Sequence, residues 1–213
     1  MTPILEELVV ADEPATWEAL GFDVRDDLVE LGGVRVRLAG RDAGEGIVSW
    51  RLRGLASTDL DGLPTAASRG EAPATAPARH PNGALALDHV VAFTDDLERT
   101  MATLRDAGLE PRRIREVPSS EMRQAFYVLG PALLELAGPV ADRDGPGFWG
   151  LVLVVADLDA LIARLGDLVG TPREAVQRER RIATLRPAAG AGIAVAFMTP
   201  RRPLKSPSSP ADA

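Results

Sequence analysis

One pattern occurs three times along the chain and constrains its fold more than any other feature. Each copy begins with an apolar run, continues through an acidic residue into a short amphipathic helix, and ends at a glycine. Acidic residues favour the N-cap of a helix and glycine favours its C-terminal end, so each copy predicts a strand followed by a helix. The three copies span residues 5–21, 85–108 and 148–170.

Further strand-like segments follow each predicted helix, separated by turn-forming residues such as Gly130-Pro131. Each repeat therefore reads as a β-α-β-β-β module, and the chain as an α+β protein. The predicted strands after the three helices are 29–31, 34–38 and 46–53, then 114–117, 124–129 and 132–137, then 181–185 and 193–198.

The composition changes between the first repeat and the second. Residues 56–84 contain four prolines and hardly any large apolar side chains, which is typical of a linker or a long surface loop. The last residues have a similar composition, and we expect a disordered tail there. The predicted domains are a degenerate module at 1–55, a linker at 56–84, paired modules at 85–140 and 147–200 (together 85–200), and a tail at 201–213.

The overall composition bounds the possible partners. The chain has 213 residues, 46% of them hydrophobic, which is enough for a sizeable core. A formal net charge of −7 disfavours nucleic acid and membrane lipid as partners and favours a neutral or cationic small molecule. The absence of cysteine excludes disulfides and thiolate metal sites. We find no secretory leader and no apolar run of about 18 residues, and expect a cytoplasmic protein.

Two polar residues lie inside apolar runs. His89 belongs to the predicted strand 85–93 and Glu135 to the strand 132–137. A histidine and a carboxylate buried in strands must be satisfied by a partner. A divalent metal, a bound ligand and a direct hydrogen bond between the two side chains are the three possibilities. If the two are in contact, the pair is a candidate general acid and base.

The residues around these two positions carry a family resemblance. The runs Leu87-Asp88-His89-Val90-Val91, Thr94-Asp95-Asp96-Leu97 and Leu133-Leu134-Glu135-Leu136 resemble the vicinal-oxygen-chelate superfamily of glyoxalases, extradiol dioxygenases and bleomycin-resistance proteins. The resemblance covers about residues 84–200 and looks like that of a glyoxalase-like domain protein from a high-GC bacterium. It implies a curved, cup-shaped mixed sheet, built from paired modules, with the helices outside.

The resemblance also implies a metal site. In that family each of two paired modules offers one residue from its first strand and one from its last, and the four converge on a divalent ion. Here the middle module supplies His89 and Glu135, whereas the third places Gly150 opposite His89 and has no acid in its last strand. His80 could fold over the cup as a third ligand, or could be a solvent-facing loop histidine. The expected cofactor is one divalent ion (Zn, Mn, Fe or Ni) or none.

Three further residues are candidates for substrate binding. Arg181 begins the strand 181–185 on the same face as its apolar residues, where it could clamp a carboxylate or phosphate, or could form a structural salt bridge. Arg123 and Gln124 open the strand 124–129, so one of them faces the cup in either register. Both could equally be solvated residues at the sheet edge.

Two functions are compatible with these residues. The first is a glyoxalase-like small-molecule enzyme of the lyase, isomerase or dioxygenase type, with a degenerate metal site and with His89 and Glu135 as catalytic residues. The alternative is a noncatalytic protein of the bleomycin-resistance type that binds or sequesters a small ligand. Either could act as a monomer or a homodimer, because modules can pair within one chain or between two.

Overall fold

The structure is a computed structural model that describes residues 2–68, 79–118, 120 to 201. Its larger sheet has eight strands in the order β11-β12-β13-β10-β6-β9-β8-β7. The strands are β6 (Ala84–Phe93), β7 (Pro111–Glu116), β8 (Arg123–Leu129), β9 (Ala132–Gly138), β10 (Gly147–Val155), β11 (Arg173–Glu174), β12 (Arg181–Thr184) and β13 (Ala194–Met198). The predicted disordered tail at 201–213 lies almost wholly outside the described residues.

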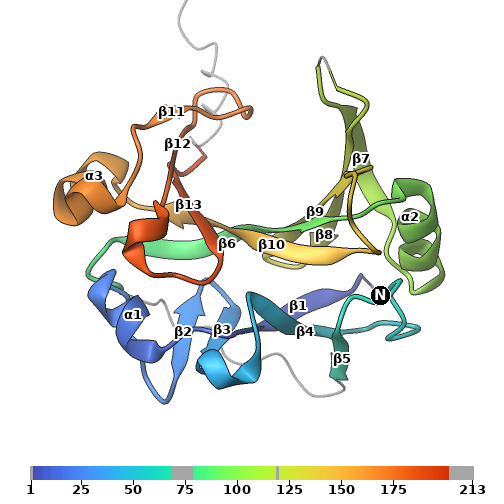
Figure 1. The fold of residues 1–213 in the computed structure, drawn as a ribbon, viewed down its shortest axis with the longest axis horizontal. Helices are drawn as coiled ribbons and strands as arrows, with labels where there is room; N and C mark the ends of the chain where they lie inside the picture. Colours follow the sequence, from blue (N-terminus) through green and yellow to red (C-terminus); the bar gives the residue numbers. More distant parts are fainter. Residues whose placement is uncertain (1, 69–78, 119, 202–213) are drawn as a thin grey trace, which may run out of the picture.

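Two modules build this sheet around one central pairing. β6 and β10 are antiparallel neighbours, β9 is parallel to β6, and β13 is parallel to β10. Figure 1 shows the sheet curving, with β7 and β12 rising at opposite ends and helices α2 (Leu97–Asp106) and α3 (Leu158–Leu165) outside it. The predicted α+β class, with modules that form a curved mixed sheet, is confirmed.

The two helices begin where the sequence predicts. The Asp96 carboxylate accepts the backbone N–H of Arg99 at 3.0 Å, and Asp157 accepts the N–H groups of Asp159 and Ala160, both at 3.0 Å. These caps satisfy backbone donors that a helix leaves free at its start. Each helix turns its apolar stripe inward, and among the described residues no helix is long and apolar enough to cross a membrane.

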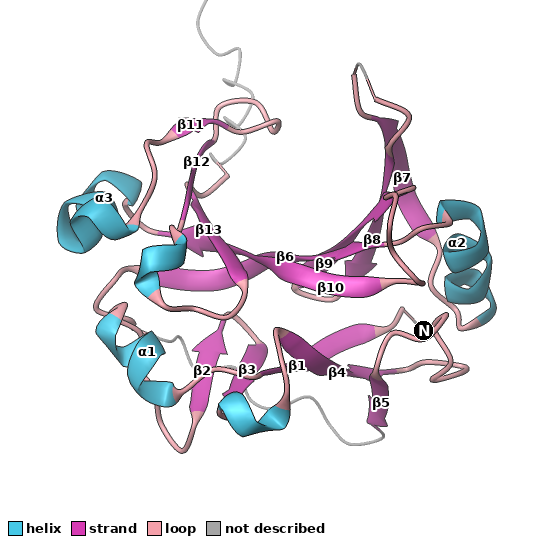
Figure 2. Cartoon of the chain, in the orientation of Figure 1, coloured by secondary structure: helices cyan, strands magenta, loops and turns pink. Residues whose placement is uncertain are grey.

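A second, five-stranded sheet is built by the N-terminal part, in the order β2-β3-β1-β4-β5. Figure 2 shows it beneath the larger sheet, on the side away from the concave face. Its elements are β1 (Ile4–Val10), α1 (Pro14–Ala19), β2 (Leu28–Leu31), β3 (Val34–Leu38), β4 (Ile47–Arg53) and β5 (Thr65–Ser68). Short 3-10 turns occur at Arg41–Ala43, Gly166–Leu168 and Pro187–Ala189.

The small sheet has the same order of parallel and antiparallel strand pairs as the central five strands of the large sheet. Successive pairs in β2-β3-β1-β4-β5 are antiparallel, parallel, antiparallel and parallel, as they are in β12-β13-β10-β6-β9. β4 was predicted as the last strand of the first module, but the last strand of a module is parallel to its first. Since β4 is antiparallel to β1, it occupies the position of β6 and begins a second half.

The segment predicted as a linker carries that second half. Residues 65–68 form β5, and Leu60 and Leu63 are buried, at 0% and 2% exposure. Backbone pairing with β4 and these two side chains hold the segment against the small sheet. Residues 69–78 of the predicted linker lie outside the described residues.

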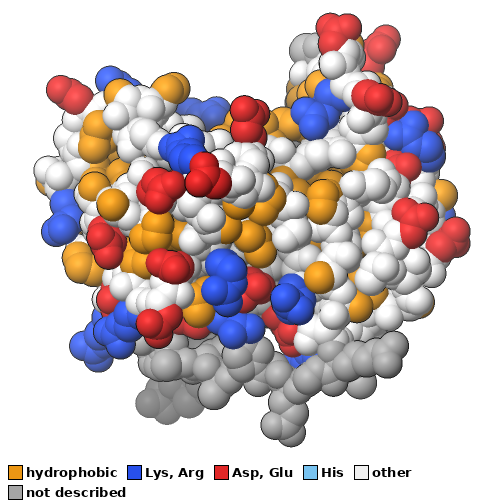
Figure 3. Space-filling view, turned by 60° about the horizontal axis from the view of Figure 1, so that its bottom comes forward, with side chains coloured by type: hydrophobic (Ala, Val, Ile, Leu, Met, Phe, Trp, Pro, Cys, Tyr) orange, Lys and Arg blue, Asp and Glu red, His pale blue; other side chains and the backbone are white. Residues whose placement is uncertain are grey.

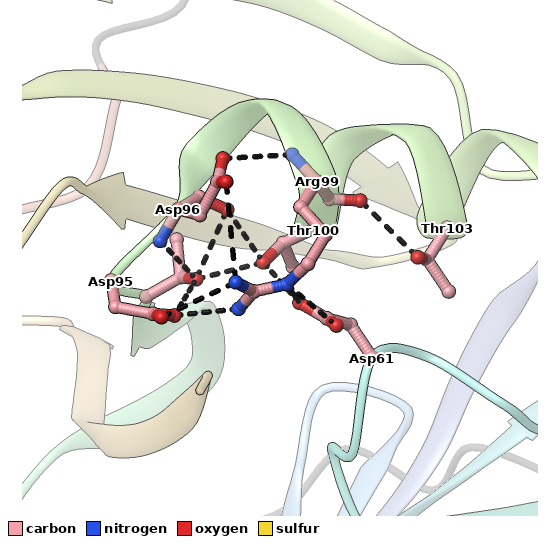
Figure 4. Close-up of polar contacts among 7 residues, drawn as sticks. Asp61, Asp95, Asp96, Arg99, Thr100 and Thr103 are labelled. Carbon is pink, nitrogen blue, oxygen red and sulfur yellow. Dashed lines mark hydrogen bonds and ion pairs between the residues drawn. The ribbon is translucent and has the colours of Figure 1, made fainter. Parts of the chain in front are cut away.

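The loop before β5 is also tied to α2. The Asp61 carboxylate accepts the Arg99 guanidinium at 3.0 Å and the Thr100 hydroxyl at 2.6 Å, and Arg99 reaches on to Asp95 at 2.6 Å (Figure 4). Thr100 is fully buried. A buried hydroxyl and a shared guanidinium therefore join the N-terminal part to the larger sheet's helix.

The two sheets share one hydrophobic core. The ring of Trp50 in β4 lies 5.0 Å from that of Phe148 in β10, and Phe22 lies 6.5 Å from Phe197 in β13. Trp17, Trp50, Tyr127 and Phe197 are among the largest fully buried side chains. The convex face of the large sheet is thus covered by the small sheet, and its concave face points away (Figure 1).

The β2–β3 turn of the small sheet lies close to β6 of the large sheet, and substitutions there can test how the two sheets pack. A Cβ on Gly32 would lie 2.5 Å from the Ala86 Cβ, and Gly32 has a φ of +62°. Gly62 has a φ of +91° and nothing within 4 Å of an added Cβ. We expect Gly62→Ala to cost about 1–2 kcal/mol of unfolding free energy from backbone strain alone. We expect Gly32→Ala to cost about 1–3 kcal/mol more, from steric overlap.

Urea unfolding of both variants measures the difference. Equal losses in Gly32→Ala and Gly62→Ala would contradict the close contact between the turn and β6.

Candidate active site

A bulge in β6 creates the polar centre of the concave face. In the pairing with β10, His89 lies opposite Val152 and Leu87 lies opposite Leu153, so Asp88 has no partner in β10. A bulge of this kind bends the strand and redirects its side chains. As a result the consecutive residues Asp88 and His89 contact each other, and the Asp88 Oδ2 accepts the His89 Nδ1–H at 2.8 Å.

The register also fixes which face these side chains occupy. Phe148 lies opposite Ala92 and packs on Trp50 of the small sheet, so Ala92 faces the core between the sheets. Strand residues alternate between faces. Val91 and His89 therefore face the concave side.

Arg180 anchors one end of this centre. Its Nη1 donates to the Asp88 Oδ1 at 2.7 Å, and its Nε donates to the Thr199 carbonyl at 2.7 Å. Arg180 is 3% exposed, and the Asp88 side chain is 7% exposed. A buried carboxylate requires this kind of compensation, because desolvation of an unpaired charge is costly.

Glu135 lies on the other side of the histidine. Its Oε2 is 3.4 Å from the His89 Nε2, and its Oε1 accepts the side-chain amide of Gln124. The Gln124 carbonyl in turn accepts a hydrogen bond from the Arg115 guanidinium. A continuous polar chain therefore crosses the sheet from β7 through β8, β9 and β6 to the residue preceding β12.

The two carboxyl groups of this polar chain, Asp88 and Glu135, have pKa values that are shifted in opposite directions. Burial alone would raise the pKa of Asp88, but hydrogen bonds and charges from His89 and Arg180 outweigh burial and hold this pKa at about 2. Burial raises the pKa of Glu135, partly opposed by the charges of His89 and Arg115. Because ionised Asp88 can only accept hydrogen bonds, the His89 Nδ1 carries a proton.

The site has no matching half in the other module. Val91 lies opposite Gly150 and beside Glu135, while Val152 lies opposite His89 and beside Ala196. The two modules are related by a pseudo-twofold axis between β6 and β10. This relation places Gly150 at the position equivalent to His89 and Ala196 at the position equivalent to Glu135, and the residue numbers in the two pairs differ by the same amount. The equivalent of a histidine is a glycine, and the equivalent of a glutamate is an alanine.

Neither position could supply a metal ligand. A Cβ at Gly150 would lie 2.2 Å from the Ala194 carbonyl oxygen, and Ala196 packs in an apolar cluster with Val152 and Met198. Within the described residues, no group of three or more His, Asp or Glu side chains is arranged to hold a metal ion. Catalytic metal sites take about three protein ligands. The side chains of this face therefore do not fit the divalent ion that the family pattern implies.

His80 does not join His89 and Glu135. Its Nδ1 accepts the Asp23 N–H at 3.0 Å, its Nε2 lies 2.8 Å from the Glu30 carbonyl oxygen, and its ring packs edge-on against Phe22. The hypothesis that His80 supplies a third ligand is not supported, because both ring nitrogens are occupied by the backbone of the N-terminal part. The residue is buried, at 7% exposure, and is not a solvent-facing loop histidine either.

The three predicted substrate-binding residues separate in the structure. Gln124 faces the concave side and contacts Glu135. Arg123 points to α2 and pairs with Glu98, and Arg181 makes a bidentate pair with Asp159 on α3 at 2.8 and 2.9 Å. Arg181 thus forms the structural salt bridge that was one of its two predicted roles.

Sequence reasoning missed three members of the polar chain: Asp88, Arg115 and Arg180. Asp88 stood beside His89 in the family motif, but ideal strand alternation would place it on the opposite face. Ideal alternation likewise places Arg180 on the face opposite to that of its neighbour Arg181, away from the apolar residues of the strand. Its position just before β12 lets its side chain reach Asp88, which alternation within the strand could not predict.

Two paired β-α-β-β-β modules with polar side chains on a concave sheet face define a glyoxalase-like protein. The family model for the Glyoxalase/Bleomycin resistance protein/Dioxygenase superfamily matches residues 88–197, just over half of the chain. The chain belongs to this superfamily, and the sequence-based assignment is confirmed.

Several solved structures are similar to about half of the chain. The chain is similar to methylmalonyl-CoA epimerase from Mycobacterium tuberculosis (24% identity, 55% of this chain, 88% of that chain, TM-score 0.46). It is similar to a hypothetical protein from Bacillus halodurans C-125 (18% identity, 56% of this chain, 97% of that chain, TM-score 0.47). It is also similar to a variant of Streptomyces coelicolor methylmalonyl-CoA epimerase in complex with 2-nitronate-propionyl-CoA (24% identity, 55% of this chain, 97% of that chain, TM-score 0.45). No curated protein sequence matches the chain significantly.

The Asp88–Arg180 pair predicts a pH-dependent stability. A pKa near 2 in the folded state, against 3.8 unfolded, contributes about 2 kcal/mol of unfolding free energy above pH 4, and this is lost as the pH falls towards 2. We expect Asp88→Asn to lose at least about this amount at pH 7, with the difference from the unaltered protein shrinking below pH 4.

Asp159→Asn is the matched control, because Asp159 pairs with Arg181 at an exposed site, where solvent screens the charges, and its loss should be much smaller. Urea unfolding at several pH values measures both variants. Equal and pH-independent losses would contradict the buried pair.

Proposed function

We propose that the protein is a glyoxalase-like enzyme that transfers a proton to and from a small molecule bound at the concave face. Glu135 is the group that meets the substrate, and the reaction uses no metal ion. The observation that carries this proposal is the placement of His89 between the ionised Asp88, to which its Nδ1 is hydrogen-bonded, and the more weakly acidic Glu135, which lies 3.4 Å from its Nε2.

The arrangement gives each residue a separate role. Asp88 and Arg180 fix the imidazole ring, with its Nδ1–H directed to Asp88 and its Nε2 directed to Glu135. Glu135 and the His89 Nε2 can then share one proton. The Glu135 side chain is 16% exposed, against 8% for His89, so the carboxylate is the more accessible of the two. Gln124 holds the Glu135 Oε1 in place.

This chemistry suits a substrate with an acidic C–H bond next to a carbonyl group. Glu135 as carboxylate takes the proton, the C–H electron pair moves into the carbonyl group, and an enolate forms. Return of a proton to the same carbon restores the carbonyl group. If that carbon also carries a hydroxyl group, the enolate is an enediolate, and once the hydroxyl proton has moved to the other oxygen, return of the proton to the neighbouring carbon completes an isomerisation. General acid–base catalysis of this kind contributes about 10²–10⁴-fold in rate. A dioxygenase reaction is disfavoured, because the donor set does not fit the redox metal that such a reaction needs.

A second candidate function is noncatalytic ligand binding. It is favoured by the apolar half of the concave face, where Val152, Ala196 and Met198 pack together. The ring of Trp149 packs edge-on against that of Phe93, with 5.6 Å between the ring centroids, and Trp149 remains 49% exposed, which offers a surface for a flat ligand.

Exchange of carbon-bound hydrogen with solvent tests the proposed enzyme directly. A panel of small ketones, 2-oxo acids and thioesters is incubated with the protein in D₂O, and loss of the C–H signal is followed by proton NMR. We expect at least one compound to exchange, and Glu135→Gln to slow that exchange by about 100-fold or more. Glu98→Gln, which alters an exposed glutamate on α2, should leave the rate unchanged.

The outcome separates the two candidate functions. Exchange that is unaffected by Glu135→Gln would contradict the proposed role. Saturable binding of panel compounds without any exchange would instead support the noncatalytic protein.

Metal addition gives an independent test. Because only two of the four family positions carry donors, we expect excess Zn²⁺ or Mn²⁺ to shift the melting temperature by less than about 1 °C, and chelator treatment to leave it unchanged. Differential scanning calorimetry measures both. A stabilisation of several degrees that disappears in His89→Ala would show that a metal site exists after all.

A further inference from the structure

The outward face of the small sheet carries a second polar centre. Glu7 in β1 lies between Arg35 of β3 and Arg51 of β4 in the strand register. Its carboxylate is 3.9 Å from the Arg35 Nε, 3.4 Å from the Arg37 Nη2 and 3.8 Å from the Arg51 Nε. Arg53 pairs with Glu6 at 2.7 Å. Four guanidinium groups therefore surround two carboxylates.

This centre arises in the same way as the one on the large sheet. The β1–β4 pairing contains a bulge between Leu5 and Glu7, so the consecutive acids Glu6 and Glu7 are both drawn into the arginine cluster. The bulge at Asp88 likewise brings two consecutive polar residues together in the large sheet. The two sheets pack back to back, so each presents a polar centre on the face that points away from the shared core.

Among the residues that the structure describes, the arginines are incompletely satisfied by protein acceptors. Within the described residues, Arg37 makes one hydrogen bond to Glu7, of 3.4 Å, whereas the side chains of Arg35 and Arg51 make none. The Arg35 Nε is buried without a hydrogen-bond partner in that part of the chain. Guanidinium groups with free N–H donors, held in place by neighbouring charges, are suited to bind an oxyanion.

The charge and exposure of the face limit the ligand. Four arginines face Glu6 and Glu7, and Glu30 adds a third carboxyl group beside Arg35, so the surplus is one to two positive charges. The side chains of Arg37 and Arg51 are 42% and 45% exposed. Figure 3, which brings this side of the molecule forward, shows basic and acidic side chains gathered beside one another. The net charge of −7 opposes a long polyanion such as nucleic acid.

We propose that this face, the Glu7–arginine cluster of Arg35, Arg37, Arg51 and Arg53, binds a small oxyanion group such as the phosphate of a small molecule. Arg35 and Arg51 lie two strands apart, about 10 Å between their Cα atoms, on either side of Glu7. Their long side chains can converge on one anion above the buried carboxylate. The proposal is independent of the chemistry on the opposite face.

Titration with inorganic phosphate tests the cluster in the full chain. At constant ionic strength, the Nε–Hε signals of the arginines are followed by ¹H–¹⁵N NMR. We expect saturable shifts of Arg35 and Arg51, and an affinity about tenfold weaker in Arg51→Gln, from loss of a charge-assisted hydrogen bond. Arg25→Gln is the control, since Arg25 is 82% exposed in the same part of the chain and pairs only with Asp23 among the described residues.

A variant that is expected to increase the affinity for phosphate distinguishes binding from a purely structural role of the cluster. Glu7→Gln removes the negative charge beneath the proposed anion and should tighten phosphate binding several-fold. If this variant does not fold, the Arg51→Gln measurement decides alone. Absence of saturable shifts, or equal weakening in Arg51→Gln and Arg25→Gln, would overturn the proposal.

Discussion

The antiparallel pairing of β6 with β10, with its bulge at Asp88, is the constraint on which the rest of this molecule depends. It joins the two modules of the large sheet and sets the register that places Val91 opposite Gly150. The same bulge makes Asp88 and His89 neighbours, which ideal alternation would separate. Without it, Arg180 would have no buried carboxylate to bind, and the imidazole would have no fixed orientation.

Loss of half of the family's ligand positions leaves a different kind of site. Gly150 allows the close approach of β13, and Ala196 continues an apolar wall, so the module from β10 to β13 contributes shape and no donors. The module from β6 to β9 keeps a histidine and a glutamate, stabilised by protein groups at both ends. A pair of this kind can hold and move a proton, which is the chemistry that we propose for this face.

The sequence predicted the elements better than their pairing. Helix caps and apolar periodicity located α2, α3 and the long strands, because these signals are local. β5 was missed, since a short strand in a proline-rich segment depends on backbone pairing with β4. At the site, His89, Glu135 and Gln124 were predicted from the family pattern and strand alternation. Arg180 was missed because the bulge and the strand end, which determine its contact with Asp88, are not visible in a periodic pattern.

The orientation of His89 is the central claim, and the chain provides its own reference, because it has only two histidines. A long-range ¹H–¹⁵N correlation spectrum at neutral pH reports which ring nitrogens carry protons. We expect the His89 Nδ1 to be protonated, as the bond to Asp88 requires, and His80 to carry its proton on Nε2 only, as its Nδ1 accepts the Asp23 N–H. A His89 ring with an unprotonated Nδ1 would contradict the account.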